Sequence, residues 1–198
     1  MKVGLILECG PAGAETKVLP VLFSMLPGGH EIDSVTMGNK PALVGGCGKA
    51  AAGLLSGGCD KVFIFWDLYP AWRESSPCRK QDCENIRDSL LKENVPLKEV
   101  VLVCIEQELE AWLIADGRAL RDFLSSAAHK TKNIRDEKSP DQVENPKAVL
   151  SRLFQKHGRG RYNDLIHAER IARKLPDLSR VRRSVSFARF AGKVEELA

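Results

Sequence analysis

The sequence predicts an α/β protein in which a mainly parallel sheet is flanked by helices and is followed by an α-helical C-terminal part. Short apolar runs typical of buried strands alternate with segments of helical periodicity along the first 124 residues. The turns that join them are short, which favours βαβ units. After about residue 145 only helical patterns follow.

The predicted strands come from four runs. Lys2–Glu8 (KVGLILE) is a short apolar run, and Lys61–Asp67 (KVFIFWD) is the clearest strand in the chain, followed by a turn at Pro70. Glu99–Glu106 (EVVLVCIE) is a further apolar strand. The segment 31–38 alternates loosely and predicts a poorer strand.

The helical segments lie between these strands. Apolar spacing predicts helices over 15–26 and 80–94, and a helix of small residues packed close to the sheet over 39–58. Residues 107–124 predict one helix that Gly117 could interrupt, with Asp116 as a feature of a helix C-terminus. Glu15 begins the first helix, where a carboxylate complements the macrodipole, so a structural role is favoured for it.

Three regions follow from this pattern: an α/β domain over 1–124, a polar loop or insertion over 125–145, and a basic helical part over 146–198. Residues 152–193 hold twelve basic and three acidic side chains, whereas residues 1–151 carry a net charge of −3. This asymmetry indicates a polyanionic partner, nucleic acid above all, although a solvated helical face explains it equally well. The candidate nucleic-acid contacts are Arg159, Arg161, Arg182 and Arg183.

Composition excludes several classes of protein. The apolar content of 43% and charged content of 28% are typical of a soluble globular protein, and no apolar run is long enough for a membrane span. The first ten residues read as a strand and not as a signal peptide. The cysteines show no zinc spacing, which favours a reduced, cytoplasmic protein. Because no apolar run is long enough for a membrane span, we expect no association with a membrane.

Acidic residues end three of the predicted strands: Glu8, Asp67 and Glu106. Ligands of parallel sheets bind beyond the carboxyl ends of the strands, and grouped carboxylates need a hard divalent cation such as Mg²⁺ to offset their repulsion. Each acid taken alone is more simply a cap or a rim residue. Glu110 extends the set, because it would share a helical face with Glu106 if the helix began that early.

Other phosphate and metal motifs do not fit. The segment VGGCGKA has Ala50 where a P-loop needs Ser or Thr, and no dinucleotide fingerprint follows the first strand. The histidines show no metal spacing. A phosphoacceptor role for Asp67, as in a response-regulator receiver, lacks the acidic pair expected after the first strand.

These residues resemble an uncharacterised bacterial TOPRIM-like family that is often found near defence and mobile-element genes. The likeness rests on Glu8, on FWD with Asp67, and above all on ELEAWLIAD, and the helical tail extends it over nearly the whole chain. It implies a TOPRIM/Rossmann-like fold, Glu8 as general acid or base, and Asp67 as the first acid of an Asp-x-Asp pair that holds Mg²⁺. Tyr69 occupies the place of the second acid, so Glu106 or Glu110 would have to supply the missing ligand.

Two hypotheses follow. The first is a nuclease that depends on Mg²⁺ or Mn²⁺, with Asp67, Glu110 and Glu106 as metal ligands and a role in phage or mobile-element defence. The second is a catalytically inactive interaction module that partners an ATPase or another defence protein, which Tyr69 favours. The sequence leaves the oligomeric state open.

Overall fold

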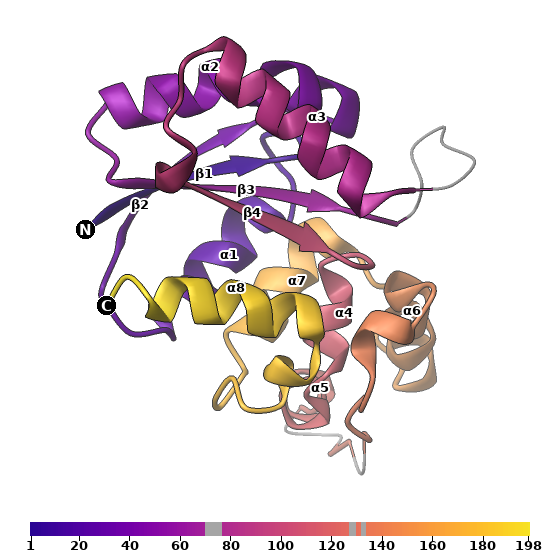
Figure 1. The fold of residues 1–198 in the computed structure, drawn as a ribbon. Helices are drawn as coiled ribbons and strands as arrows, with labels where there is room; N and C mark the ends of the chain where they lie inside the picture. Colours follow the sequence, from indigo (N-terminus) through magenta and orange to yellow (C-terminus); the bar gives the residue numbers. More distant parts are fainter. Residues whose placement is uncertain (70–76, 127–129, 132–133) are drawn as a thin grey trace.

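The sheet has four strands, all parallel, in the order β2-β1-β3-β4 (Figure 1). The computed structural model describes residues 1–69, 77–126, 130–131 and 134–198, so the turn predicted at Pro70 lies outside the described residues. The strand bounds are β1 (Lys2–Leu7), β2 (Glu31–Thr36), β3 (Lys61–Asp67) and β4 (Val100–Ile105). The predicted α/β class with a parallel sheet is therefore confirmed.

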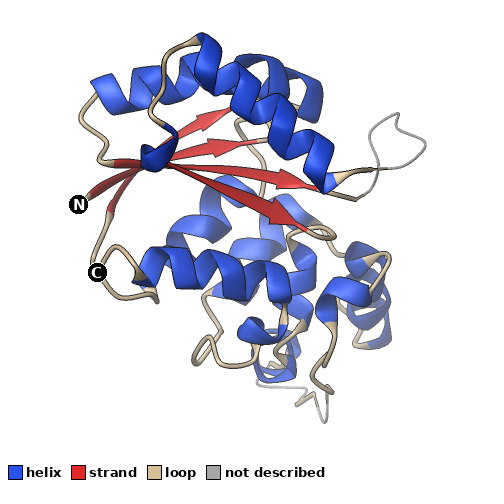
Figure 2. Cartoon of the chain, viewed as in Figure 1, coloured by secondary structure: helices blue, strands red, loops and turns tan. Residues whose placement is uncertain are grey.

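Helices cover both faces of the sheet (Figure 2). On one face lie α2 (Lys40–Ser56) and α3 (Arg79–Lys92), and on the other lie α1 (Glu15–Ser24) and α8 (Val185–Glu195). The remaining helices extend this second layer away from the sheet. They are α4 (Glu110–Ile114), α5 (Gly117–Leu124), α6 (Pro146–Lys156) and α7 (Asp164–Ala172), with the 3-10 turns η1 (Leu97–Glu99), η2 (Pro140–Gln142) and η3 (Val181–Arg183).

Burial on both faces explains why the strands read as unbroken apolar runs. Along β3, Phe63 and Phe65 belong to the core beneath α1 and α8, whereas Ile64 and Trp66 belong to the core beneath α2 and α3. Successive side chains of a strand point to opposite faces, so every side chain of a strand that is covered on both faces is buried and apolar residues are favoured throughout.

The predicted helix over 107–124 is interrupted next to Gly117, the residue at which an interruption was considered, and the structure has two helices there. α4 ends at Ile114, and Asp116 is the N-cap of α5, where its carboxylate accepts hydrogen bonds from the backbone N–H groups of Arg118 (2.8 Å) and Ala119 (3.4 Å). Asp116 is thus a helix start and not a helix end.

The first of these two helices also begins later than predicted. β4 ends at Ile105 and α4 begins at Glu110, so Glu106 lies in the turn between them. The shared helical face expected for Glu106 and Glu110 therefore does not form.

The C-terminal helices share one core with the sheet. α8 packs under β4, and Phe190 stacks on Trp112 of α4 with ring centroids 5.8 Å apart. Phe187 meets the same indole edge-on at 5.1 Å. Residues on both sides of position 145 therefore contribute to a single hydrophobic cluster.

The glycine-rich helix α2 packs on the sheet as predicted, and it also lies tightly against α3. A Cβ atom on Gly48 would come within 2.1 Å of the carbonyl oxygen of Ser89, whose side chain accepts a hydrogen bond from the Gly48 N–H (3.2 Å). Only glycine permits this approach between the two helices.

Two further findings bear on the class of protein. Within the part of the chain that the structure describes, no helix has the length and apolar character needed to cross a bilayer. The six cysteines are all free thiols.

Candidate functional site: an acidic cavity at the carboxyl edge of the sheet

A cavity of about 130 Å³ lies beyond the carboxyl ends of β1, β3 and β4. Three carboxylates of the described residues line it, from Glu8, Glu15 and Asp67, and we call it the acidic cavity. The other described residues that line it are Cys9, Gly38, Asn39, Phe65, Trp66 and Ile105. The strand ends that sequence reasoning singled out therefore do converge for Glu8 and Asp67.

Of the three carboxylates, Asp67 is the one whose ionised form is least favoured by its surroundings. It is the last residue of β3, its Oδ1 is buried, and none of the described residues gives that oxygen a hydrogen bond. Burial raises the pKa of its carboxyl well above the usual range, and the charges of Glu15, Glu8 and Glu110 raise it further. A buried, unpaired carboxylate is costly, so this position favours a proton or a cation.

Glu8 follows β1 and is tied to Asp67 by the backbone. Its Oε2 accepts a hydrogen bond from the Asp67 N–H at 3.1 Å, while its own N–H donates to the carbonyl of Phe65 at 3.2 Å. Burial raises the pKa of Glu8, although the Asp67 hydrogen bond and the charge of Lys40 oppose the rise. The carboxyl is thus positioned beside Asp67 and holds its proton more tightly than an exposed glutamate does.

Glu15 was missed as a site residue by the sequence reasoning, which favoured a structural role at the start of a helix. It does begin α1, but it also lines the acidic cavity, and its charge is the largest carboxylate influence on the pKa of Asp67. Its position in the sequence could have indicated this role, because Glu15 follows the CGPAG turn directly after β1 and therefore lies near the edge where β1 ends.

Glu110 lies behind the acidic cavity and does not line it. It is buried at the start of α4, where its Oε1 accepts a hydrogen bond from the hydroxyl of Tyr162 at 3.1 Å and its Oε2 is 3.9 Å from the Lys147 ammonium. Burial raises the pKa of Glu110 to about 7, with Lys147 opposing the rise. Its charge reaches Asp67, but its oxygens are already engaged.

The Lys147 ammonium lies within 4 Å of three carboxylates of the described residues. Its Nζ is 3.3 Å from Glu108 and 3.5 Å from Asp164 in addition to Glu110. Burial alone would lower the pKa of Lys147, yet these carboxylates and Asp67 raise it, so the ammonium stays charged. Neither Lys147 nor Tyr162 carried a motif, because both come from the helical part and reach the site only through tertiary packing.

Glu106 lies apart from these acids. Its Oε1 is held by two guanidinium groups, from Arg79 of α3 at 3.0 Å and from Arg189 of α8. The structure therefore places this predicted ligand on an exposed ion-pair bridge at the edge of the sheet.

A buried ion pair supports the floor of the acidic cavity. The Lys40 ammonium lies 2.9 Å from Asp82, and the Trp66 indole N–H donates to the same carboxylate at 3.0 Å. Lys40 opens α2 directly after Asn39, whose side chain caps the helix by accepting from the Ala42 N–H. The cation bears electrostatically on Glu8 from this side.

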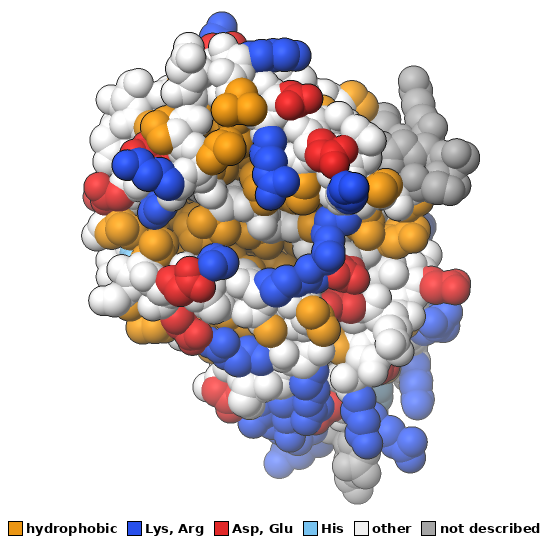
Figure 3. Space-filling model, viewed as in Figure 1, with side chains coloured by type: hydrophobic (Ala, Val, Ile, Leu, Met, Phe, Trp, Pro, Cys, Tyr) orange, Lys and Arg blue, Asp and Glu red, His pale blue; other side chains and the backbone are white. Residues whose placement is uncertain are grey.

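The four arginines predicted to contact nucleic acid differ in their surroundings. Arg159 donates to the carbonyl oxygens of Leu124 and Ser125 at 2.9–3.0 Å, which caps the end of α5. Arg182 pairs with Glu195, Arg183 pairs with Asp136 at 3.2 Å, and Arg161 is exposed. Figure 3 shows basic side chains gathered at the lower end of the helical half.

The metal predicted from the sequence can be weighed on donor chemistry. Across residues 1–69, 77–126, 130–131 and 134–198, no three histidine, cysteine or acidic side chains are arranged so that they could hold a metal ion. Mg²⁺ commonly uses only one or two protein carboxylates and keeps several waters. The oxygen donors, the unpaired Asp67 Oδ1 and the size of the cavity fit such a partly hydrated ion.

Comparison with known proteins gives one match. The family model described as Domain of unknown function (DUF4276) matches residues 40–195. No curated protein and no solved structure gives a significant match.

Proposed function

The chain belongs to the DUF4276 family, and we propose that it is a Mg²⁺-dependent enzyme that cleaves nucleic-acid phosphodiesters at the acidic cavity. The observation that carries the proposal is the convergence of Glu8, Glu15 and Asp67 on one cavity in which Asp67 Oδ1 is buried and unpaired. A divalent cation would relieve both the repulsion and the unpaired oxygen. Mn²⁺ would serve the same donor set.

The cation would be held by Asp67 and Glu15, with water completing its shell. When bound, a divalent metal polarises a phosphoryl oxygen and lowers the pKa of a bound water. Glu8 would act as general acid or base, because it is fixed beside Asp67 and its raised pKa brings its proton exchange closer to neutral pH. Glu110 would act on the site through its charge, and Glu106 has no part in it.

The polyanionic substrate is supported by the basic C-terminal part. Arg161, Arg182 and Arg183 are at least partly exposed and are available to phosphate groups, whereas Arg159 is engaged with the backbone of α5. Contacts to phosphates make binding strongly dependent on salt. The resemblance to TOPRIM-like proteins suggests a defence role against phages or mobile elements.

The test is cleavage of supercoiled plasmid, single-stranded DNA and RNA in the presence of Mg²⁺ or Mn²⁺. We expect Asp67→Asn and Glu15→Gln to reduce the rate at least 100-fold, since each removes a carboxylate from the proposed cation. Glu106→Gln is the matched control, and it should retain the wild-type rate. Equal rates in wild type and Asp67→Asn would overturn the proposal.

The second candidate is an interaction module without catalysis that partners an ATPase or another defence protein. Tyr69 favours it: this residue stands where the resemblance calls for a second acid, is 40% exposed, and is absent from the described lining of the acidic cavity. Calorimetry with Mg²⁺ separates the two functions. Heat that disappears in Asp67→Asn supports the enzyme, and the absence of any site-dependent heat supports the module.

A further inference from the structure

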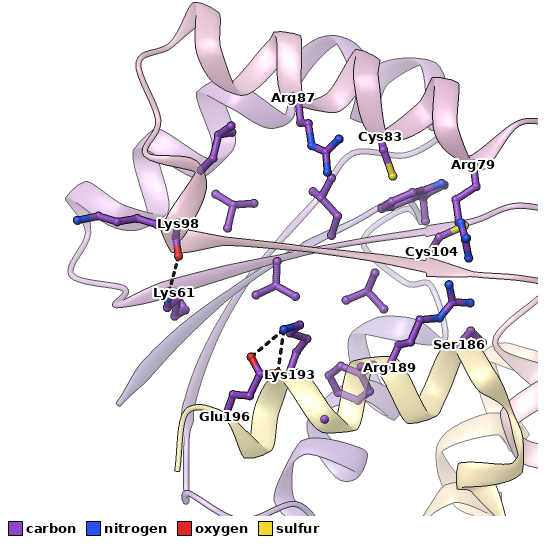
Figure 4. A pocket seen from close by; sticks show the side chains of 18 of the residues that line it. Lys61, Arg79, Cys83, Arg87, Lys98, Cys104, Ser186, Arg189, Lys193 and Glu196 are labelled. Carbon is purple, nitrogen blue, oxygen red and sulfur yellow. Dashed lines mark hydrogen bonds and ion pairs between the residues drawn. The ribbon is translucent and has the colours of Figure 1, made fainter.

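A second and much larger cavity runs along the open edge of the sheet, and its lining differs from that of the acidic cavity. It has a volume of about 920 Å³ and lies between α3 and α8, with β4 as its floor (Figure 4). We call it the β4 groove and define it by Val100–Cys104 of the strand, Arg79 and Arg87 of α3, and Arg189 and Lys193 of α8.

The floor of the β4 groove is an unpaired strand edge. Within the described parts of the chain, β4 pairs with β3 on one side and with no strand on the other. The carbonyl of Ile105 accepts a hydrogen bond from Leu68, so this residue faces β3. Because backbone groups alternate along a strand, Leu102 and Cys104 direct their N–H and C=O groups outward, into the groove. Such a row is a template for another strand.

The same edge is apolar. Val100, Val101 and Leu102 are only half-buried, and Leu97 beside them is 42% exposed. In Figure 3 an orange band of hydrophobic atoms crosses the middle of the molecule between two lines of blue side chains. An extended segment laid on this floor would bury apolar side chains on both of its faces.

The rim of the β4 groove is basic. Among the described lining residues, six are Lys or Arg and one is acidic, which gives a net charge of +5, or +4 when Glu106 at one end of the groove is included. These basic residues are Lys61, Arg79, Arg87, Lys98, Arg189 and Lys193. Figure 4 shows Arg79 and Arg87 of α3 and Arg189 and Lys193 of α8 on opposite sides of the strand, with Lys193 paired to Glu196. This positive charge favours a partner that carries acidic groups.

We propose that the β4 groove binds an extended acidic peptide segment of a partner protein, which adds to β4 as a fifth strand. About five or six residues suffice, because β4 has six residues and a strand rises about 3.3 Å per residue. Main-chain hydrogen bonds to Leu102 and Cys104 supply affinity, and Asp or Glu side chains opposite Arg87 and Lys98 supply selectivity.

Two other occupants fit less well. A second copy of this chain would bring an equally basic rim against the first, so the like charges would repel. A nucleic acid would satisfy the rim, but it offers neither a backbone that matches a strand edge nor side chains for the apolar floor. The acidic peptide satisfies the edge, the floor and the rim together.

The experiment selects a ligand from a displayed library of random octapeptides on the full chain and on the double variant Arg87→Glu/Lys98→Glu. The matched control is Lys49→Glu/Lys92→Glu, which reverses two exposed lysines outside the groove. We expect acidic, alternating sequences from the wild type and the control, and a loss of at least ten-fold in affinity for the groove variant. Backbone amide spectra verify that each variant is folded.

A labelled sample of the chain then locates the best synthetic peptide by amide chemical shifts. Perturbation centred on Leu102 and Cys104, abolished when alternate peptide nitrogens are methylated, supports strand addition. Peptides without acidic enrichment, or shifts elsewhere, overturn the proposal. So does tighter, groove-dependent binding of a single-stranded oligonucleotide, or dimerisation that the groove variant removes. Activity at the acidic cavity should be unchanged in Arg87→Glu, so this outcome is independent of the nuclease assay.

Discussion

Asp67 and Asp116 are both acids with buried oxygens at the end or the start of a secondary-structure element, yet their surroundings are opposite. Asp116 is fully buried and receives two arginines, Arg118 at 2.6 Å and Arg180 at 3.5 Å, together with the backbone N–H groups that begin α5. Asp67 has other carboxylates as its neighbours and one oxygen without a partner among the described residues.

The two environments shift the pKa in opposite directions. Burial acts against ionisation at Asp116, but the hydrogen bonds from Arg118 outweigh it and lower the pKa. At Asp67 burial and neighbouring carboxylates act together and raise it. A carboxylate whose charge is stabilised by its neighbours is thus distinguished from one whose charge is opposed by them, and the same isosteric change should have opposite effects on stability.

The largest effect is expected for Asp116→Asn. The amide retains the helix cap but weakens the hydrogen bonds that the buried carboxylate accepts from Arg118 and Arg180, which should cost about 3 kcal/mol or slightly more of unfolding free energy. The two arginines keep Asp177 and Asp136 as partners. Urea denaturation at pH 7 measures it. Asp177→Asn, which removes an exposed partner of Arg118, is the control and should cost far less. Equal losses in the two variants would contradict the structural role of Asp116.

Glu110→Gln should change the pH dependence of stability. The pKa of Glu110 rises from 4.5 to about 7 in the folded chain, so the unfolded state ionises first and the wild type loses stability as pH rises through that interval. This contribution is on the order of 3 kcal/mol, and the glutamine variant should lack it. Denaturation midpoints between pH 4.5 and 8, with a chelator present, provide the measurement. Parallel profiles would show that Glu110 does not titrate there.

Gly117→Ala probes how tightly the Asp116 junction is packed. A Cβ atom there would lie 2.3 Å from the carbonyl oxygen of Ile134, so we expect a loss of about 2 kcal/mol. Gly10→Ala is the counterpart in the turn beside the acidic cavity, where an added Cβ meets nothing within 4 Å. Thermal unfolding of the pair should separate the rigid junction from the open turn, and a similar loss at Gly10 would argue against that contrast.

The smallest effect, and the one with the opposite sign, is expected for Asp67→Asn. Removing an unpaired buried charge should stabilise the metal-free protein by on the order of 1 kcal/mol at pH 8, and an amide N–H can donate to Glu8 or Glu15. Because the pKa of Asp67 is raised, the gain should shrink as pH falls and the wild-type carboxyl becomes protonated. Destabilisation at pH 8 would mean that Asp67 has a partner in solution.

Much of the fold could be predicted from local patterns. The run KVFIFWD is apolar at every position before Asp67 because β3 is covered on both faces, and such a run is readable without any partner in view. The alternation of strands and helices then implies a parallel sheet, and a parallel sheet places Glu8 and Asp67 at one edge. Gly117 marked a possible interruption of the helix, but the role of Asp116 as the cap of a new helix was not predicted, since an acid can stand at a helix start or near a helix end.

The amino-acid sequence by itself therefore determined the strands, most of the helices and the acidic character of the carboxyl edge, because these depend on contacts within one element or on a repeating pattern. Only the tertiary structure decided which acids meet. Glu106 is ion-paired with Arg79 and Arg189 outside the acidic cavity, and Glu110 is bound by Tyr162 and Lys147 behind it. The start of α1 places Glu15 in the cavity wall. The tertiary structure also left β4 as an edge between two helices that place basic side chains in the β4 groove. These outcomes rest on partners far apart in the chain, and no local spacing encodes them.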